Sequence, residues 1–240
     1  METQPLKDKL CLVTGGSRGI GGAITRMLLS EGARVAICGK HQNTVDTAVA
    51  QLDQLSPGKV IGKAADVKDY EAVRELFAYV DRTLGGLDIL INNAGVGRFT
   101  KASELSVEDW AATIGTNLSG AFYCAREALL RFATRGGGYI VNISSLAGRN
   151  AFAGGAAYNA SKFGLNGFSE ALMLDSRYDN VRVSTVAPGS VATEFGGQAS
   201  GADWKVQPGD VAEVVRMLLR LPARTMASYV EVRPAKPPRK

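Results

Sequence analysis

The apolar positions of this chain follow two alternating periods. Short runs rich in β-branched residues recur along it, and longer stretches with apolar residues at helical spacing separate them. The short runs predict strands at Leu10–Thr14, Arg34–Cys38, Val60–Lys63, Leu87–Asn92, Tyr139–Ser144, Val181–Val186 and Ser228–Val232. The longer stretches predict helices at about residues 19–31, 42–55, 69–84, 106–134, 156–177 and 209–220.

Several of the predicted strands are apolar on both faces. Residues 87–92 and 139–143 are nearly continuous apolar runs, which is typical of parallel strands that helices cover on both sides. Strand followed by helix, repeated along the chain, is the pattern of a doubly wound α/β sheet. We therefore predict a Rossmann-like parallel sheet of about seven strands, flanked by helices on both faces, in one domain that spans residues 1–240.

A glycine-rich turn follows the first predicted strand. Glycines in such a turn allow a close approach of the backbone to a pyrophosphate, and the N-terminus of the next helix favours the anion. The turn predicts a nucleotide site, and a glycine turn without a ligand is the alternative. The candidate contacts are Gly15, Ser17, Arg18, Gly19, Ile20 and Gly21.

The end of the second strand indicates which dinucleotide is bound. An acidic residue there would hydrogen-bond the ribose of NAD, but this chain has Gly39 and Lys40 instead. Lys40 and Arg18 suit a 2′-phosphate, so we predict NADP(H); the alternative is that both cations are ordinary surface residues. Asp66, next to Val67 after the third strand, is a candidate contact to the adenine amino group, or else a helix cap.

A tyrosine and a lysine lie four residues apart in a predicted helix. Tyr158 and Lys162 therefore share one helix face. A tyrosine hydroxyl has an ordinary pKa near 10, and a nearby ammonium group favours its phenolate. The pair is a candidate for acid–base catalysis; the alternative is a half-buried tyrosine beside a solvated lysine.

Ordered motifs along essentially the whole chain resemble the short-chain dehydrogenase/reductase family, in its single-domain branch. The resemblance is to 3-oxoacyl-thioester reductases and carbonyl reductases. It rests on Thr14-Gly-x-x-x-Gly19-x-Gly21, Asp66, Asn92-Asn93-Ala94-Gly95, Asn117, Ser144-Ser145, Tyr158-x-x-x-Lys162 and Pro188-Gly189.

The resemblance implies a role for each catalytic candidate. The family's functional serine lies about thirteen positions before the tyrosine, which selects Ser145 over Ser144. Ser145 would hold the substrate oxygen, and Tyr158 would donate the proton. Lys162 would bind the nicotinamide ribose and tune the tyrosine, and Asn117 would order a water molecule in a proton relay.

The resemblance also implies further cofactor contacts. On the adenosine side these are Asn93, Ala94 and Gly95, and at the nicotinamide they are Pro188, Gly189, Val191 and Thr193. Apolar residues after the strands would either line a substrate pocket or belong to the core, and the core is the more common place for such residues. They are Phe99, Leu146, Phe152, Phe195 and Trp204.

Together these features predict an NADPH-dependent oxidoreductase that reduces a ketone or aldehyde by hydride transfer. Candidate substrates are 3-oxoacyl thioesters, small diketones and quinones. The alternatives are an NADP-dependent alcohol or sugar dehydrogenase that works in the oxidative direction, and a catalytically idle NADP-binding module. The resemblance further implies a homo-oligomer, a dimer or tetramer paired through the helices at 106–134 and 156–177.

Composition limits the partners. The 240 residues are 45% hydrophobic and 21% charged, with a net charge of +5. Most of this excess lies in the proline-rich segment 231–240, which contains four basic residues and one acidic residue and is predicted to be a solvated tail. Without a nucleic-acid-binding motif, we predict no nucleic-acid partner.

Neither a membrane span nor a metal site is predicted. No apolar run reaches about 18 residues, and no signal-peptide pattern opens the sequence, so the expected location is cytoplasmic. Cys11, Cys38 and Cys124 are far apart, and His41 is the sole histidine. We therefore expect neither a disulfide framework nor bound metal.

Overall fold

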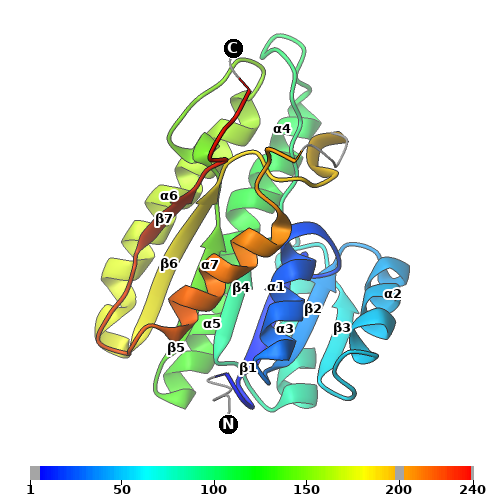
Figure 1. Ribbon diagram of the computed structural model, residues 1–240, viewed down its shortest axis with the longest axis vertical. Coiled ribbons are helices and arrows are strands. Elements are labelled where there is room, and N and C mark those ends of the chain that lie inside the picture. The colour runs from blue at the N-terminus through cyan, green and yellow to red at the C-terminus, as the bar shows by residue number, and fades with distance from the viewer. Residues whose placement is uncertain (1–5, 198–202, 239–240) are drawn as a thin grey trace.

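Seven parallel strands form the centre of the computed structural model, which describes residues 6–197 and 203–238. The strands are β1 (Leu10–Thr14), β2 (Arg34–Gly39), β3 (Val60–Ala64), β4 (Ile89–Asn92), β5 (Gly138–Ile143), β6 (Val181–Pro188) and β7 (Tyr229–Val232). The helices are α1 (Gly19–Ser30), α2 (Gln42–Asp53), α3 (Tyr70–Leu84), α4 (Val107–Ile114), α5 (Gly120–Arg135), α6 (Ala156–Ser176) and α7 (Pro208–Arg220). The sheet order is β3-β2-β1-β4-β5-β6-β7 (Figure 1).

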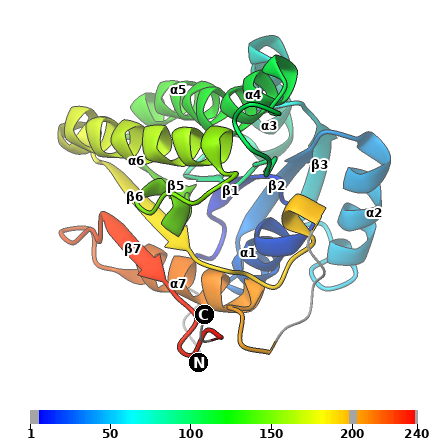
Figure 2. The same ribbon diagram turned by 90° about the horizontal axis from the view of Figure 1, so that it is seen from above.

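Helices cover both faces of this sheet, as Figure 2 shows. On one face, α1 and α7 pack side by side and bury Leu28 and Val215 against the strands. On the other face, α3 and α5 bury Phe77 and Phe132 in a second core. The prediction of a doubly wound α/β sheet is confirmed.

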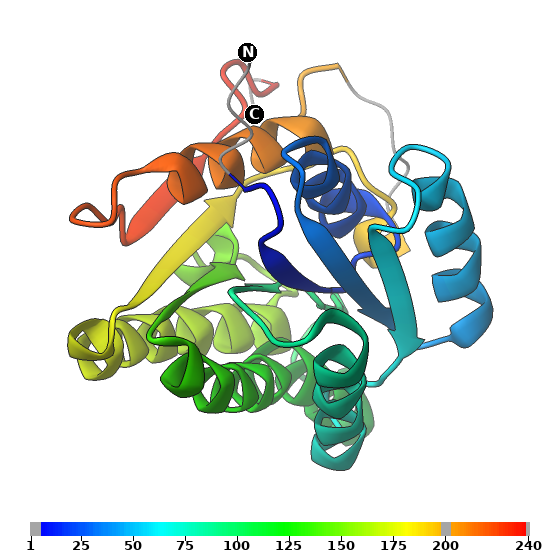
Figure 3. The same ribbon diagram turned by 90° about the horizontal axis from the view of Figure 1, so that it is seen from below.

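The strand order reverses between β1 and β4. In β1, Val13 is in register with Ile37 of β2 on one side and with Ile91 of β4 on the other. Chain connections leave this point in opposite directions, so the loops after β1 and β4 separate and leave a crevice at the carboxyl ends of the strands. Figure 3 views the molecule from the other side, where the strands begin. The fold therefore places the predicted chemistry at one edge of the sheet.

One predicted helix differs from the structure. The stretch expected at 106–134 is divided into α4, a π-helical turn at Gly115–Ser119 and α5. A π turn adds a residue to the helical repeat, yet the apolar spacing around it stays close to helical, so the sequence pattern did not reveal it. Its consequence is local: the turn carries Asn117, which it buries.

The predicted tail also differs from the structure at its beginning. Glu231 and Val232 belong to β7, where they pair with Ala187 and Pro188 of β6. The segment at 231–240 is therefore anchored in the sheet at its start, and residues 239–240 lie outside the described part of the chain.

Candidate functional site

The loops after β1 and β4 are joined across the crevice by hydrogen bonds. Thr14 Oγ1 accepts the backbone N–H groups of Asn93 and Ala94, both at 3.0 Å. In return, Asn93 Nδ2 donates to the carbonyl oxygens of Thr14 and Gly15 at 3.0 and 3.1 Å. These bonds hold the glycine-rich turn in place, and the role of Thr14 in them was not predicted from the sequence.

Backbone geometry explains the glycines of this turn. Gly15 and Gly19 have φ angles of +63° and +56°, which favour glycine. A Cβ atom at Gly21 would collide with the carbonyl oxygen of Gly15, whereas one at Gly19 would meet only Thr193, at 3.5 Å. The turn is thus closely packed at Gly21 and open at Gly19, where α1 begins. This open space at a helix N-terminus fits a pyrophosphate.

Two basic side chains lie at the rim of this crevice. Arg18 Nη1 is 3.3 Å from Glu194 Oε2, and both side chains are largely exposed. Lys40 Nζ is 3.4 Å from Asp66 Oδ2. Each predicted phosphate ligand therefore has an acidic neighbour. Ion pairs on the surface are screened by salt, and the attraction between their partners is weak. Arg18 and Lys40 can therefore exchange these carboxylates for a phosphate, which carries more negative charge.

Asp66 is not the cap of the helix that follows it. Asp69 caps α3, since its carboxylate accepts the N–H of Glu71 at 2.9 Å. Val67, next to Asp66, is buried and packs on Gly120 at the start of α5. The capping alternative is thereby removed for Asp66, which leaves its carboxylate at the rim.

Ser17 and Gly39 are neighbours across the turn. A Cβ atom at Gly39 would lie 3.6 Å from Ser17 Oγ and 3.3 Å from a methyl group of Val45. The backbone N–H of Gly16 donates to the Cys38 carbonyl at 3.1 Å. The ends of β1 and β2 are thus closely packed, and the predicted contacts at both ends face one region.

The nicotinamide-side candidates form the loop after β6. The N–H of Gly189 donates to the Val232 carbonyl at 2.8 Å, and Val191 pairs with Val206 in an isolated parallel bridge. A Cβ atom at Gly189 would lie 2.9 Å from the side chain of Leu146. β7 and the start of α7 therefore fix this loop against the residues that follow β5.

Lys162 is buried beside Tyr158. It is 4% exposed, and its Nζ atom donates to the Ile143 carbonyl at 2.9 Å. Nζ lies 5.9 Å from the centre of the Tyr158 ring. Burial lowers the pKa of Lys162 to about 8, because an ammonium group loses hydration inside the protein. The alternative of a solvated lysine is wrong.

The tyrosine hydroxyl faces Ser145. Burial raises the pKa of Tyr158, while the hydrogen bond with Ser145 acts to lower it. Ser145 Oγ also accepts the N–H of Ala147 at 3.1 Å and donates to the Pro188 carbonyl at 3.4 Å. Burial is the larger of these two effects and raises the pKa of Tyr158 above its ordinary value of 10, so the hydroxyl is protonated at neutral pH.

The side chain of Asn117 is held by three hydrogen bonds. Its Oδ1 accepts the N–H of Val96 at 2.8 Å, and its Nδ2 donates to the Val96 carbonyl at 2.9 Å and to Ser161 Oγ at 3.0 Å. The side chain thus clamps the loop after β4 to α6. Ser161, one residue before Lys162, is a positioning residue that sequence motifs did not single out.

Aromatic side chains surround Tyr158. Phe99, Phe152 and Phe195 are 39, 46 and 37% exposed, so of the two alternatives that the sequence left open, a place in the core is wrong for all three. The ring centres of Phe99 and Phe195 lie 5.5 and 5.6 Å from that of Tyr158. The other two apolar candidates, Leu146 and Trp204, are half-buried.

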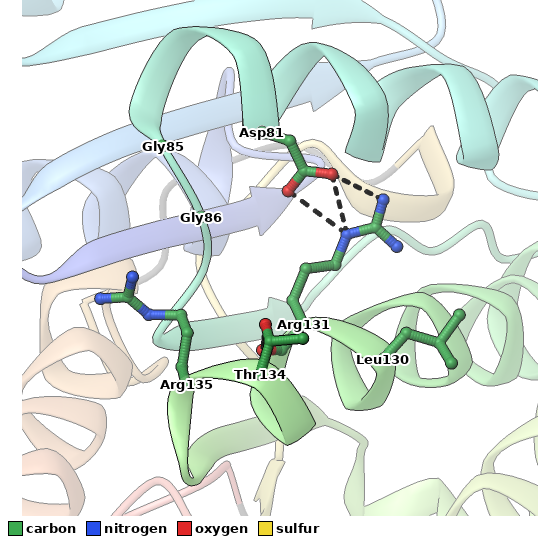
Figure 4. Close-up of a pocket in the computed structure, with 7 residues that line it drawn as sticks. All are labelled: Asp81, Gly85, Gly86, Leu130, Arg131, Thr134 and Arg135. Carbon is green, nitrogen blue, oxygen red and sulfur yellow. Dashed lines mark hydrogen bonds and ion pairs between the residues drawn. The ribbon is translucent and has the colours of Figure 1, made fainter.

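A separate pocket of about 500 Å³ lies at the opposite edge of the sheet, between the end of α3 and the last turns of α5 (Figure 4). Its two arginines are already paired: Arg131 contacts Asp81 at 2.8 Å, and Arg135 contacts Asp88 at 2.8 Å. The charges cancel, and none of the catalytic candidates lines this pocket. The chemistry of the molecule is concentrated at the carboxyl ends of the strands.

Residues 6–197 and 203–238 contain no group of three or more His, Cys, Asp or Glu side chains arranged to hold a metal ion. In the same ranges, none of the helices has both the length and the apolar character needed to cross a membrane.

Known proteins share this arrangement. The short chain dehydrogenase family matches residues 9–203. A 3alpha-hydroxysteroid dehydrogenase of Mediterraneibacter gnavus is 35% identical over 237 residues, covering 94% of this chain and 93% of that protein. An alcohol dehydrogenase of Thermococcus sibiricus, solved with 5-hydroxy-NADP, is 28% identical with a TM-score of 0.90, covering 98 and 100% of the two chains. An actinorhodin polyketide ketoreductase solved with NADPH is 31% identical with a TM-score of 0.87, covering 98% of each chain.

A parallel sheet with a glycine-rich turn at its switch point, and a serine, tyrosine and lysine at the carboxyl ends of its strands, defines a dinucleotide-binding α/β protein. The chain belongs to the short-chain dehydrogenase/reductase family and is an NAD(P)-binding oxidoreductase.

Proposed function

We propose that this protein uses NADPH to reduce a ketone or aldehyde carbonyl to an alcohol, with Tyr158 as the proton donor. The observation that carries the proposal is the grouping of Ser145, Tyr158 and buried Lys162 at the carboxyl ends of the strands. Among the described residues, Lys162 Nζ has one hydrogen-bond acceptor, the Ile143 carbonyl. An ammonium group has three donors, so two remain for the hydroxyls of a nicotinamide ribose.

Preference for NADP(H) over NAD(H) rests on charge. No carboxylate ends β2, and Arg18 and Lys40 lie at the rim where a 2′-phosphate would approach. Both similar structures described above hold NADP-type cofactors, which supports the same choice here. Gly15, Gly19 and Gly21 would hold the pyrophosphate, with Asp66 on the adenine.

The chain's own groups would act on the carbonyl oxygen. NADPH, when bound, supplies the hydride that reaches the carbonyl carbon. The Ser145 hydroxyl donates a hydrogen bond to the oxygen, and Tyr158 transfers its proton there as negative charge develops. The ammonium of Lys162 stabilises the phenolate that remains.

Asn117 would act in the relay through its main chain. Its side-chain amide is already bonded to Val96 and Ser161, so a relay water would be held by its carbonyl oxygen in the π turn. That water would return a proton to Tyr158 by way of Lys162.

Turnover and cofactor binding together test the proposal. NADPH absorbance is followed with a panel of ketones, oxoacyl thioesters and quinones, for the wild type and for Tyr158→Phe. The variant is expected to lose turnover by about 100-fold or more while it binds NADPH as before. Faster oxidation of alcohols with NADP⁺ than reduction of any ketone would favour the dehydrogenase alternative. NADPH binding without turnover would favour the idle module.

We further propose that a second copy of this chain covers α5 and α6. Their outer faces expose apolar side chains that a monomer would leave in water: Phe122, Leu130, Phe163 and Leu174 are 45, 55, 46 and 46% exposed. The two helices already share aromatic packing between Phe122 and Phe168, with ring centres 5.9 Å apart. Sedimentation as a dimer or tetramer that Phe122→Glu converts to a monomer would support this, and a wild-type monomer at micromolar concentration would refute it.

A further inference from the structure

Three phenylalanine rings from three different loops form one cluster, and two of them, Phe99 and Phe195, pack on Tyr158. Phe99 follows β4, Phe152 follows β5 and Phe195 follows β6. The Phe99 ring contacts that of Phe152, at 5.7 Å between centres, and that of Phe195, at 6.4 Å, in addition to Tyr158. All three rings keep more than a third of their surface exposed, so they form a continuous apolar wall that is open on one side.

Glycines shape two sides of this wall. A Cβ atom at Gly97 would lie 2.7 Å from Phe195 and 2.8 Å from Phe99, closer than carbon atoms approach without displacement. A Cβ atom at Gly196, whose φ angle is +67°, would collide with the Phe99 ring. The rings therefore rest on bare backbone of neighbouring loops, and a side chain at either glycine would push them away from the site.

The loop that carries Phe152, the third part of the wall, is held by hydrogen bonds. Asn159 Oδ1 accepts the N–H of Phe152 at 3.3 Å, and its Nδ2 donates to the Ala147 carbonyl at 2.7 Å. The N–H of Thr100 donates to the Gly154 carbonyl at 2.9 Å, which ties the loop of Phe99 to that of Phe152. Asn159 is buried next to Tyr158 in α6, so the helix that carries the proton donor also sets the position of the wall.

No basic side chain covers the rings of the wall. In the described ranges, no arginine or lysine lies over any of the three rings. Arg98 pairs with Asp109 at 3.2 Å, and Arg149 shares Glu231 with Arg233. These arginines are exposed and screened by solvent, whereas a substrate carboxylate or phosphate laid against the rings would lose its hydration, so the wall favours an uncharged molecule.

We propose that the substrate is a flat, uncharged cyclic ketone, or the matching secondary alcohol, whose ring system lies against Phe99, Phe152 and Phe195. Its one polar atom meets the hydroxyls of Ser145 and Tyr158. This inference rests on the proposed function and narrows it to a substrate class. Aromatic faces and edges at mixed angles match a rigid planar ring, whereas a flexible chain of equal size loses rotational freedom on binding.

Two ketones of equal carbon number test the shape preference. 2-Tetralone is planar and fused, 2-decanone is linear, and 2,3-butanedione is too small to reach the wall. The wild type is expected to turn over 2-tetralone with a kcat/KM at least tenfold above that of 2-decanone. Phe99→Leu and Phe152→Leu keep apolar bulk but remove a ring, and each is expected to cut this preference about fivefold to tenfold. Turnover of 2,3-butanedione, which does not reach the wall, measures any general loss of activity in each variant, and the preference is taken relative to it.

Tyr178→Ala is the matched control, because it removes an aromatic ring that is 86% exposed at the far end of α6. It should change neither the kcat/KM for 2-tetralone nor that for 2-decanone. Binding of 2-naphthol to the NADP⁺ complex, measured by calorimetry, gives a second readout that needs no turnover, and the Leu variants should weaken it. Equal kcat/KM for 2-tetralone and 2-decanone, or Leu variants that leave both the preference and 2-naphthol binding unchanged, would overturn the inference. In that case, loss of 2,3-butanedione turnover in Tyr158→Phe would show that the proposed function still stands.

Discussion

Arg18 Nη1 lies 3.3 Å from Glu194 Oε2, so a salt bridge joins the glycine-rich turn to the loop after β6. These residues are 176 positions apart in the chain. Arg18 is also a candidate ligand for the 2′-phosphate of NADP(H). A phosphate at this position would compete with the Glu194 carboxylate for the same guanidinium group, and the nearby carboxylate would also repel it.

Replacing Glu194 with Gln is therefore expected to tighten NADPH binding. Exposed ion pairs are worth about 0.2–1 kcal/mol, which corresponds to an increase in affinity of up to about fivefold. NADH has no 2′-phosphate, so its affinity should change by less than twofold. Titration of protein fluorescence with each cofactor measures both values.

Glu71→Gln is a matched control for this experiment, because Glu71 forms an equally exposed pair with Arg74 on α3. It should leave the affinity for both cofactors unchanged. If Glu194→Gln tightened NADH and NADPH equally, the effect would come from the loop rather than from the 2′-phosphate, and the role given to Arg18 would be wrong.

Much of the architecture could be predicted because burial selects residue types. The central strands are covered on both faces, and runs such as Ile89–Asn92 and Gly138–Ile143 are accordingly apolar at nearly every position. Strand order and the π turn at Gly115–Ser119 have no comparable pattern of residue types in the sequence. Order depends on how distant strands pair, and a π turn leaves the apolar spacing close to that of an α-helix.

In the candidate site, too, some features could be predicted from the sequence and others depend on tertiary packing. Spacing along one helix face was enough to bring Tyr158 and Lys162 together, but the burial that lowers the pKa of Lys162 comes from packing. Partners far apart in sequence, such as Arg18 and Glu194, could not be paired from the chain alone. Nor could the exposure of Phe99, since apolar side chains after strands are usually buried and only the loops of the fold keep this one open.

Lys162→Met is expected to remove turnover while it stabilises the protein without cofactor. The folded-state pKa of about 8 lies below the ordinary value of 10.5, so the charged form is disfavoured by folding and its burial costs stability at neutral pH. A methionine of similar length has no such cost but loses the hydrogen bond to Ile143, so the expected net gain is about 1–2 kcal/mol.

Thermal unfolding of the protein without cofactor measures this gain. The stability difference shrinks with pH: between about 8 and 10.5 the unfolded chain binds the Lys162 proton and the folded chain does not, so wild-type stability rises toward that of the variant. A variant that is less stable at pH 7, or a difference that does not shrink by pH 10, would contradict the stated cost of burial.

The rate of reduction is expected to fall as the pH rises through about 8. Above that value Lys162 becomes neutral and no longer stabilises the phenolate that Tyr158 leaves when it donates its proton. Tyr158 itself does not titrate in this range, because burial raises its pKa from the ordinary 10. The kcat/KM for reduction should approach a tenfold loss per pH unit above 8.

Lys162→Arg provides the check on this assignment. Arginine stays charged throughout the range, so the variant should retain a flat profile between pH 7 and 9, at whatever lower level of activity its larger group allows. If kcat/KM for reduction still fell above pH 8 in Lys162→Arg, another group would control the rate.

Ser161→Ala is expected to lower turnover without weakening cofactor binding. Ser161 Oγ accepts a hydrogen bond at 3.0 Å from Asn117 Nδ2, the donor that also holds the Val96 carbonyl at 2.9 Å. Asn117 and Ser161 are almost fully buried, so removing one partner leaves an amide N–H unsatisfied at a cost of about 1–3 kcal/mol. The strain falls on the π turn and its carbonyl, which we assign to the proton relay.

A relay defect has a signature that simple destabilisation does not. The solvent isotope effect on kcat should rise in Ser161→Ala, because proton transfer becomes more rate-limiting, while the KM for NADPH stays within twofold. Ser161→Thr keeps the hydroxyl and should restore most of the rate. Loss of NADPH affinity in parallel with kcat, with no recovery in Ser161→Thr, would mean that Ser161 only supports the packing of α6 against the loop after β4.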